Sequence, residues 1–531
     1  MSEAIKELIT RAVQSVSSRD DLSALKRRLS KEYKIDSLLN ADIILEYKRL
    51  LAEKSITANP ELEYLLRKRS IRTLSGIAPV AVLTKSYPCP GTCAYCPRQE
   101  DVPVSYLSNE PAVMRAIRCH YHPYTQVASR LRALENNGHR PEKMEIIVIG
   151  GTWSYLPVKY KYWYILNCFK AANDYKAEGK ILKLAYPQKL SLSDLLKLLK
   201  KEQKKNETAR YRIIGLTLET RPDYINHKEL EEMRLLGCTR VEIGVQAPDD
   251  AILQLNKRGH GVAEIIEATK LLKRYGFKIT YHLMPALPGS TPAKDLSMFK
   301  QLFDGDSFQP DQIKFYPTVV TKGSLLYKWY QQGKYKPYSD QVLQELIVKC
   351  KAEVPEYVRI IRLIRDIPAE SIIAGNKITN LRQIMQQRGV KCNCIRCREV
   401  KDGVVRDRQL NVLKYLASGG VEYFISIDSE DHRVLYAFCR LRLDRSSPIA
   451  PAIIRELHVY GELMPVGSDK KVQHRGLGKE LLLKAEKIAL ENNFLKIAVI
   501  SGVGVRDYYR KTGYKLKNSY MIKTLTDKKS H

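Results

Sequence analysis

Seven segments rich in β-branched residues alternate with helical patterns between residues 76 and 385, and this alternation limits the possible folds more than any other feature of the chain. Strands that alternate with helices form a parallel sheet with right-handed crossovers, so we expect a partial or complete (β/α) barrel. In such barrels the reactive side chains project from the carboxyl ends of the strands. The candidate strands are Val80–Thr84, Glu145–Gly150, Ile213–Leu218, Arg240–Val245, Lys278–Met284, Gln312–Tyr316 and Arg359–Ile364.

Three further regions accompany the barrel pattern, as a chain of 531 residues requires, because this length exceeds one ordinary hydrophobic core. Residues 1–75 have apolar positions at helical spacing and basic clusters such as Lys26-Arg27-Arg28, which predict a helical, basic segment. Residues 386–405 form a cysteine-rich linker after the barrel domain of residues 76–385. Residues 406–531 predict a mixed α/β domain, with candidate strands at Tyr423–Asp428, Tyr436–Leu443 and Ile453–Tyr460.

The chain is strongly basic, with 89 Lys and Arg residues against 58 Asp and Glu residues and a formal net charge of +31. This excess favours a polyanionic partner through counterion release, and nucleic acid is the expected one. A basic surface that only promotes solubility is the alternative. The sequence has no apolar run of about 18 residues and no basic leader followed by an apolar stretch, so we expect a cytoplasmic protein without membrane association.

Cys89, Cys93 and Cys96 lie in one short loop after the first candidate strand. Together with Cys392, Cys394 and Cys397 they make two tight groups among eleven cysteines, which indicates metal ligands rather than a disulfide framework. Iron–sulfur clusters are usually held by four thiolates, so the first group of three predicts a cluster with one iron left open for a small molecule. A structural zinc site is the alternative.

The second cysteine group lies between the two predicted α/β domains. Zinc is the expected ion at Cys392, Cys394 and Cys397, with a fourth ligand from elsewhere in the chain, and it would fix the domain junction. A second iron–sulfur cluster is the alternative.

Glycines and polar residues follow several candidate strands, where a barrel places its active site. Gly150 and Gly151 would let the backbone approach a ligand beside the cluster. Glu219 is suited to ribose hydroxyls, Arg221 to a carboxylate, and Gln246 ends the next strand. A plain strand-to-loop turn is the alternative for the two glycines, and a buried structural ion pair is the alternative for Glu219 and Arg221.

The run Gln473-His-Arg-Gly-Leu-Gly-Lys479 opens an amphipathic helix between the strands Ile453–Tyr460 and Leu495–Ser501. Gly476, Leu477 and Gly478 would free backbone N–H groups for a pyrophosphate, which the helix dipole favours at that end. Tyr508 and Tyr509 follow on another short helix and point about 100° apart, so one should pack and the other should face a ligand. Packing of both is the alternative.

The first cysteine spacing resembles the radical S-adenosylmethionine (SAM) superfamily. That resemblance implies a 4Fe-4S cluster whose open iron is chelated by SAM, and a position for the SAM amino group at Gly150 and Gly151. The glycine-rich helix start resembles the acetyl-CoA site of the GNAT acetyltransferases. It implies that Tyr509 lies near the CoA sulfur, where it can protonate the departing thiolate.

The two modules in this order resemble the family of Elongator catalytic subunits over almost the full length. Long strings carry the resemblance, among them Glu219-Thr-Arg-Pro-Asp-Tyr224, Gly237-Cys-Thr-Arg-Val-Glu-Ile-Gly-Val-Gln246 and Arg455-Glu-Leu-His-Val-Tyr-Gly461. The family implies that an adenosyl radical takes hydrogen from the acetyl-CoA methyl group and that the carbon radical adds to C5 of the wobble uridine, position 34. Thioester hydrolysis then leaves 5-carboxymethyluridine.

The family also implies the binding residues and partners. Acetyl-CoA would be bound by Lys143, Glu456, Leu457, His458, Val459, Leu477, Gly478, Lys479 and Tyr509. The tRNA anticodon stem-loop would contact the N-terminal segment, and the protein would act as a homodimer or with accessory subunits. Two other functions remain as alternatives to wobble-uridine modification. The chain could be a protein lysine acetyltransferase with a structural cluster, or a non-catalytic RNA-binding assembly subunit.

Overall fold

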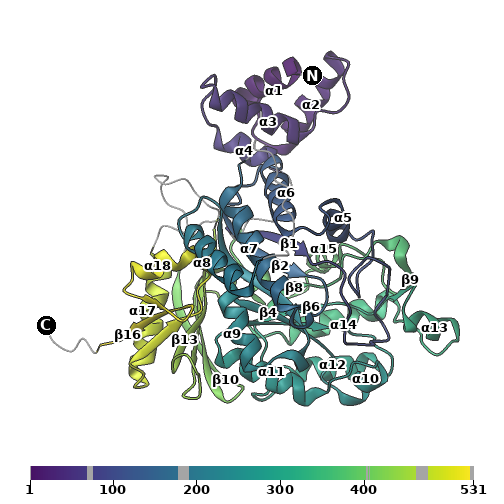
Figure 1. Ribbon diagram of the computed structural model, residues 1–531. Helices are drawn as coiled ribbons and strands as arrows, with labels where there is room; N and C mark the ends of the chain where they lie inside the picture. The colour runs from purple at the N-terminus through teal and green to yellow at the C-terminus, as the bar shows by residue number, and fades with distance from the viewer. Residues whose placement is uncertain are drawn as a thin grey trace.

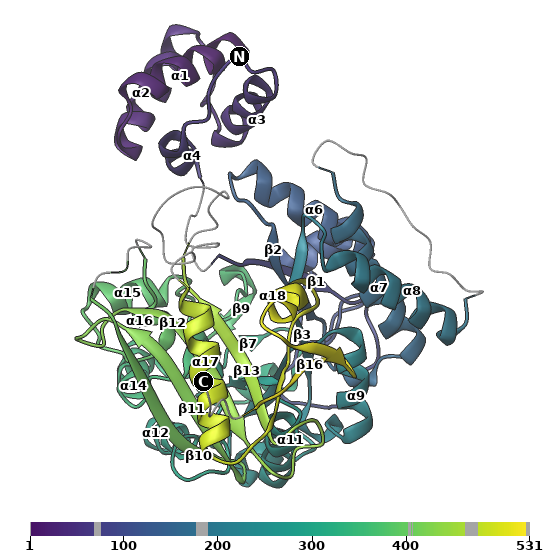
Figure 2. The same ribbon diagram turned by 90° about the vertical axis from the view of Figure 1, so that its left-hand side faces the viewer.

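The computed structural model describes residues 2–67, 76–176, 190–401, 405, 407–461 and 476–526. Four N-terminal helices stand apart from the α/β body of the molecule (Figures 1 and 2): α1 (Ser2–Ser15), α2 (Arg19–Glu32), α3 (Asn40–Ala52) and α4 (Pro60–Leu66). They bury a core of their own that includes Leu8, Leu29 and Ile43. The apolar spacing had predicted this helical segment.

The N-terminal helices touch the body through α6 (Pro123–Asn136). Lys48 Nζ donates a 3.1 Å hydrogen bond to the Glu135 carbonyl, and Arg140 forms a 2.7 Å ion pair with Glu63. Exposed pairs of this kind contribute about 0–1 kcal/mol each. The N-terminal helices therefore have a core of their own and are joined to the body by these polar contacts and by packing of α3 on α6.

The central sheet has seven strands, all parallel, in the order β1-β2-β3-β4-β5-β6-β8. Its edge strands β1 and β8 are not paired with each other, so the sheet is a half-barrel, which is the partial form of the predicted fold. All seven predicted strands are confirmed. Their bounds are β1 Ala78–Leu83, β2 Lys143–Ile149, β3 Arg212–Thr220, β4 Arg240–Gln246, β5 Lys278–Leu283, β6 Gln312–Phe315 and β8 Arg359–Arg362.

Helices cover the outer face of the half-barrel (Figure 1). They are α6, α7 (Val158–Asp174), α8 (Leu192–Asn206), α9 (His227–Leu236), α11 (Val262–Arg274), α12 (Pro292–Gln301) and α14 (Asp340–Ala352). The edge strand β1 is completed by a side chain of α6: the Leu83 N–H donates to Gln126 Oε1 at 2.8 Å, and Gln126 Nε2 donates to the Leu83 carbonyl at 2.9 Å. This pairing satisfies backbone groups that an edge strand leaves open.

Shorter elements lie at the carboxyl ends of the strands and before the second domain. They are α5 (Pro111–Arg118), α10 (Asp250–Leu255), β7 (Val320–Thr321), α13 (Leu325–Gln331), β9 (Ile372–Ala374), α15 (Leu381–Gln387) and α16 (Ile395–Arg398). Among the described residues, none of the helices combines the length and apolarity that a bilayer crossing needs.

The C-terminal domain is a second seven-stranded sheet in the order β10-β11-β12-β13-β14-β16-β15, backed by α17 (Leu477–Glu491). Only β13 and β14 run parallel, and they pair over three residues before separating, so most of Arg455–Val459 has no partner on that side. The strands are β10 Gln409–Ala417, β11 Gly420–Asp428, β12 Leu435–Leu443, β13 Ala452–Val459, β14 Lys496–Val499, β15 Lys515–Lys517 and β16 Tyr520–Thr524.

The C-terminal domain packs under the amino ends of the half-barrel strands. Arg455 of β13 donates to Asp311, just before β6, at 2.9 Å, and Lys278 of β5 pairs with Glu456 of β13 at 3.0 Å. The backbone of Gly502 lies so close to β3 that a Cβ would stand 1.9 Å from the Ile214 carbonyl oxygen. One continuous apolar core runs through both domains, so their relative placement is fixed by packing and charge.

Candidate active site

Cys89, Cys93 and Cys96 lie on the loop that follows β1, at the carboxyl edge of the half-barrel. The loop is anchored by backbone hydrogen bonds from Ala94 to Asn256 at 3.0 Å and from Leu326 to Ala94 at 2.7 Å. Tyr95 is buried in an apolar cluster against which Cys93 and Cys96 also pack. The cysteine loop is therefore where strand-end geometry predicted it.

Two arginines face the cysteine loop. Arg258 donates to Cys93 Sγ at 3.3 Å and to the Gly244 carbonyl at 2.7 Å. A hydrogen bond with Cys96 and the charge of Arg258 lower the pKa of Cys93 to about 4, although burial opposes this shift. Metals bind the thiolate form, so this environment favours ligation.

Arg221 is the second arginine, and it carries an unused donor. Its Nε and Nη2 donate to Asp223 at 2.9 and 2.8 Å. Its Nη1 is buried beside Gly91 of the cysteine loop and has no hydrogen-bond partner among the residues that the structure describes. A buried unpaired guanidinium N–H is costly unless a ligand completes it. The three thiols and this donor fit a cluster that binds a small molecule with a carboxylate.

The other predicted strand-end residues surround the cysteine loop. Gly150 and Gly151 have φ values of +132° and +100°, and a Cβ on Gly150 would lie 2.2 Å from Thr84 Oγ1, so only glycine fits there. Gln246 also has a positive φ, +67°, and its carbonyl accepts from the Met284 N–H at 2.8 Å. Strained backbone of this kind is typical of functional sites.

Glu219 belongs to an ionic cluster inside the half-barrel that also contains Glu242, His282 and Lys314. Ligand atoms of Glu219, Glu242 and His282 lie within 4.8 Å of one another, and Lys314 Nζ lies 3.6 Å from Glu219 and in contact with Glu242. Burial lowers the pKa of Lys314, but the nearby carboxylates outweigh this and raise it to about 12. The ammonium of Lys314 therefore supplies the positive charge that the two carboxylates of this cluster share.

Sequence reasoning found only Glu219 of this cluster. Glu242, His282 and Lys314 come from three different strands, and only the register of β4, β5 and β6 brings them together. A signal existed: Lys278, Thr280 and His282 are polar at every second position of one strand, which places them on one face.

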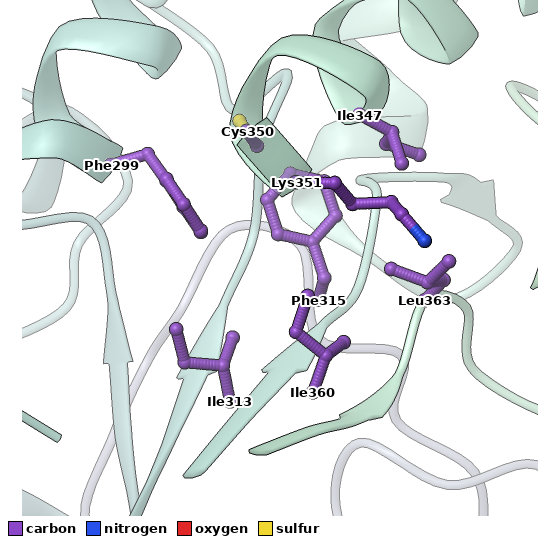
Figure 3. Close-up of a pocket in the computed structure, with 8 residues that line it drawn as sticks. All are labelled: Phe299, Ile313, Phe315, Ile347, Cys350, Lys351, Ile360 and Leu363. Atoms are coloured by element: carbon purple, nitrogen blue, oxygen red, sulfur yellow. The ribbon is translucent and has the colours of Figure 1, made fainter. Parts of the chain in front are cut away.

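The outer face of the same strands is apolar. A small void between β6, β8, α12 and α14 (Figure 3) is lined by Phe299, Ile313, Phe315, Ile347, Cys350, Lys351, Ile360 and Leu363. Its volume of about 10 Å³ is that of roughly one water molecule. This void is too small for a substrate. The polar side chains of β6, Gln312 and Lys314, alternate along the strand with the apolar Ile313 and Phe315 that line the void.

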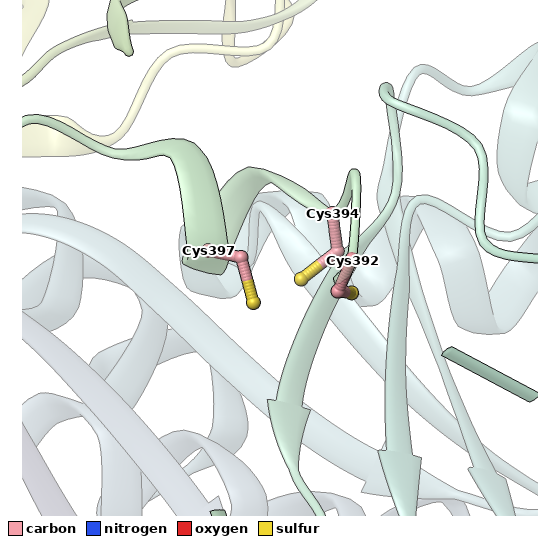
Figure 4. A group of neighbouring side chains, drawn as sticks. All are labelled: Cys392, Cys394 and Cys397. Atoms are coloured by element: carbon pink, nitrogen blue, oxygen red, sulfur yellow. The ribbon is translucent and has the colours of Figure 1, made fainter. Parts of the chain in front are cut away.

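Cys392, Cys394 and Cys397 point toward one another (Figure 4), with their sulfur atoms within 4.8 Å. Lys351 Nζ lies 4.0 Å from Cys397 Sγ. Among the described residues, no His, Asp or Glu joins the three sulfurs within that distance. The predicted grouping is confirmed, and it has the compactness that a single ion requires, while the identity of that ion and of a fourth ligand stays a prediction.

The predicted CoA-binding helix start is present at α17. Gly476 caps the helix with φ +75°, and Gly478 lies in the first turn, where a Cβ would stand 3.0 Å from Tyr508 Oη. Leu477 is buried and Lys479 is exposed, whereas Gln473 lies outside the described residues. The open backbone at this turn has the form expected of an anion site.

The Glu456–Val459 stretch lies where β13 has separated from β14. Lys278 and Arg440 hold the pKa of Glu456 well below its usual range, although burial opposes them. Burial lowers the pKa of His458 to about 4, and its ring stacks on Phe438. Leu457 and Val459 are half-buried, so this stretch keeps partly exposed side chains.

Tyr508 and Tyr509 diverge as predicted, but the accessible phenol is not the expected one. Tyr509 is 5% exposed and packs on Tyr514, whereas Tyr508 is 39% exposed and has its hydroxyl beside Gly478. The docking of α18 (Arg506–Arg510) against the sheet decides which ring turns inward. Tyr509 is the more buried of the two phenols, and the catalytic role of Tyr508 or Tyr509 stays a prediction.

Lys143 begins β2 and pairs in register with Arg212 of β3. Arg212 in turn lies against Gly504 of the C-terminal domain. Burial and the neighbouring Arg212 lower the pKa of Lys143. Lys143 therefore lies close to the junction of the two domains, and its role in acetyl-CoA binding stays a prediction.

Residues 83–302 match the Radical SAM superfamily, and residues 310–389 match the Radical_SAM C-terminal domain. With the half-barrel and the three-cysteine loop, these matches define a radical SAM protein. The chain is 43% identical over 477 residues to the tRNA uridine(34) acetyltransferase of Dehalococcoides mccartyi, covering 86% of this chain and 100% of that protein.

Other relatives agree. The chain is 36% identical to human Elongator complex protein 3, over 99% of this chain and 96% of that one. The solved structure of the archaeal Methanocaldococcus infernus Elp3, with an N-terminal deletion, matches with a TM-score of 0.71 and 38% identity, covering 85% of this chain and 100% of that chain. The chain belongs to the family of tRNA uridine(34) acetyltransferases and Elongator complex protein 3.

Proposed function

We propose that this chain is a radical SAM enzyme that modifies the wobble uridine, position 34, of tRNA and forms 5-carboxymethyluridine from acetyl-CoA. The observation that carries the proposal is the placement of two ligand-type sites at opposite ends of one half-barrel. The cysteine loop lies at the carboxyl ends of the strands, and β13 of the C-terminal domain is ion-paired to their amino ends.

The residues at the carboxyl ends suit a 4Fe-4S cluster and SAM. Cys89, Cys93 and Cys96 would hold three irons, and Arg221 Nη1 would take the SAM carboxylate. Gly151 has open space beyond its Cα for the methionine moiety. When bound, the cluster and SAM supply the radical that removes hydrogen from the acetyl methyl group.

The C-terminal site suits acetyl-CoA. The N–H groups at Gly476–Lys479 would bind the pyrophosphate, and the unpaired edge of Glu456–Val459 would hold the pantetheine arm. Tyr508 Oη lies within reach of the same turn and would donate a proton to the departing thiolate. We propose a GNAT-type site on these grounds.

The tRNA would be held by charge. A net charge of +31 and the N-terminal helices, which have a core of their own, fit an appendage that binds the anticodon stem-loop. We further propose a cytoplasmic enzyme, accessory subunits or a second copy as partners, and zinc at Cys392, Cys394 and Cys397, which elemental analysis of the protein would detect.

The proposal is tested with reconstituted protein, tRNA, acetyl-CoA, SAM and dithionite. Mass spectrometry of the digested tRNA should find 5-carboxymethyluridine, and the Cys93→Ala variant should form neither this product nor 5′-deoxyadenosine. Product formation by Cys93→Ala at the wild-type rate would contradict the radical mechanism. Acetylated lysine in place of the uridine product would favour the acetyltransferase alternative.

A further inference from the structure

One face of β5 leads from the C-terminal domain toward the cysteine loop. Lys278, at its start, contacts Glu456 of β13, and Met284, just after its end, packs on the same apolar cluster as Cys93 and Cys96. His282 shares a face with Lys278 and lies between these two ends, about 13 Å along the strand from Lys278. It therefore lies in the space that a group shared by the two sites must reach.

The imidazole of His282 is held by a carboxylate that cannot move freely. His282 Nε2 lies 2.8 Å from Glu242 Oε2, and Glu242 is fully buried and also engaged by Lys314 and by Arg240 at 3.6 Å. Because two cations fix Glu242, the carboxylate fixes the ring of His282. A carboxylate that orients an imidazole in this way is a recurring arrangement of general bases.

The second ring nitrogen is available. Nδ1 of His282 has no hydrogen bond within the part of the chain that the structure describes, and the side chain is 17% exposed. The ring packs edge-on against Tyr316, with centroids 5.5 Å apart. Nδ1 can therefore accept a proton from water inside the half-barrel while Nε2–H points at Glu242.

We infer that His282 is the general base that activates water for hydrolysis of the CoA thioester once the acetyl group is attached to uridine, and that Glu242 is its positioning residue. This inference rests on the proposed function. Water loses a proton to Nδ1 as its oxygen bonds to the thioester carbonyl carbon, and the carbon–sulfur bond then breaks. The CoA sulfur leaves with a proton, so the products are the carboxylic acid and a thiol, and no electron is gained or lost.

The neighbouring groups do not compete for this role. Lys314 and Arg240 are cations that pair with Glu242. Glu219 pairs with Lys314 and accepts a 3.1 Å hydrogen bond from the Tyr106 hydroxyl. Tyr316 offers a phenol whose pKa burial raises. The imidazole of His282 keeps one ring nitrogen, Nδ1, without a hydrogen bond among the described residues, and this nitrogen can accept a proton from water.

The test uses His282→Gln, with His227→Gln as the matched control, because His227 is exposed on α9. Each full-length protein is loaded with its cluster and given tRNA, acetyl-CoA, SAM and dithionite. Three quantities are measured: 5′-deoxyadenosine, 5-carboxymethyluridine, and tRNA that carries CoA covalently. For His282→Gln we expect 5′-deoxyadenosine near the wild-type amount, product formation lowered about a hundred-fold or more, and accumulation of the tRNA–CoA conjugate.

A second variant guards against simple structural damage. His282→Ala leaves room for a small base, so added imidazole should restore part of the hydrolysis and remove the conjugate. Wild-type product formation by His282→Gln would overturn the inference, and so would loss of 5′-deoxyadenosine together with product while cluster absorbance is normal. If the wild-type protein itself makes no uridine product, the proposed function fails instead, which separates the two results.

Discussion

Asp311 holds the two α/β domains together, and its removal has a calculable consequence. Its carboxylate accepts from Arg455 at 2.9 Å and lies 3.7 Å from Arg440, and all three side chains are at most 1% exposed. Asp311→Asn removes the charge but keeps an acceptor for the Ile279 N–H, which donates to Asp311 at 2.9 Å. The two arginines would then be buried with less compensation.

Removing one partner of a buried ion pair costs about 3–5 kcal/mol. With a urea dependence of about 3 kcal/mol per molar, the unfolding midpoint should fall by about 1 M or more. The measurement is urea unfolding followed by circular dichroism, with Asp304→Asn as the control, because Asp304 is exposed and lies seven residues earlier in the chain. Equal midpoints for Asp311→Asn and Asp304→Asn would refute the view that buried charge fixes the domain junction.

Three further predictions concern binding, chemistry and pH. The affinity for tRNA should fall steeply as salt rises, by about 0.9 log units per log unit of salt for each neutralised phosphate, and a flat response in a filter-binding assay would contradict the charge argument. Tyr508→Phe should slow CoA release about a hundred-fold or more while Tyr509→Phe mainly lowers the melting temperature, and the reverse order would contradict the assignment. Burial lowers the pKa of His458 from 6.5 to about 4. As the pH falls from 6.5 to 4, the unfolded state therefore binds a proton that the folded state does not, and the free energy of unfolding should decrease. His458→Gln should lack that loss in thermal unfolding between pH 6.5 and 4.

Much of the fold was predictable because burial on both faces gives parallel strands continuous apolar runs. All residues of β4 except Gln246 are buried, and the strand was predicted although Arg240 and Glu242 interrupt its apolar residues. The strand β10 was missed because it lies at a sheet edge, with alternating exposed positions such as Leu416, and reads as neither buried strand nor loop. Tertiary pairing with β11 decides its structure.

The candidate site was predictable where spacing along the chain carries the chemistry. Both cysteine groups and Gly476–Lys479 are local motifs. The sulfur atoms of Cys392, Cys394 and Cys397 lie within 4.8 Å of one another, and Gly476 opens α17 as its motif requires. Glu242, His282 and Lys314 come from three different strands, and their meeting depends on the sheet register. The outward ring of the tyrosine pair depends on how α18 docks, which helical spacing alone leaves open.

The most direct test of the central claim, that radical chemistry acts on acetyl-CoA within one half-barrel, is the fate of the methyl hydrogens. Acetyl-CoA carrying three deuterium atoms on its methyl group is given to the reconstituted protein with tRNA and SAM. The deuterium content of 5′-deoxyadenosine and of the modified uridine is then measured by mass spectrometry. The account predicts one deuterium in 5′-deoxyadenosine and two in the uridine side chain. If the uridine product forms but 5′-deoxyadenosine contains no deuterium, the claim is contradicted.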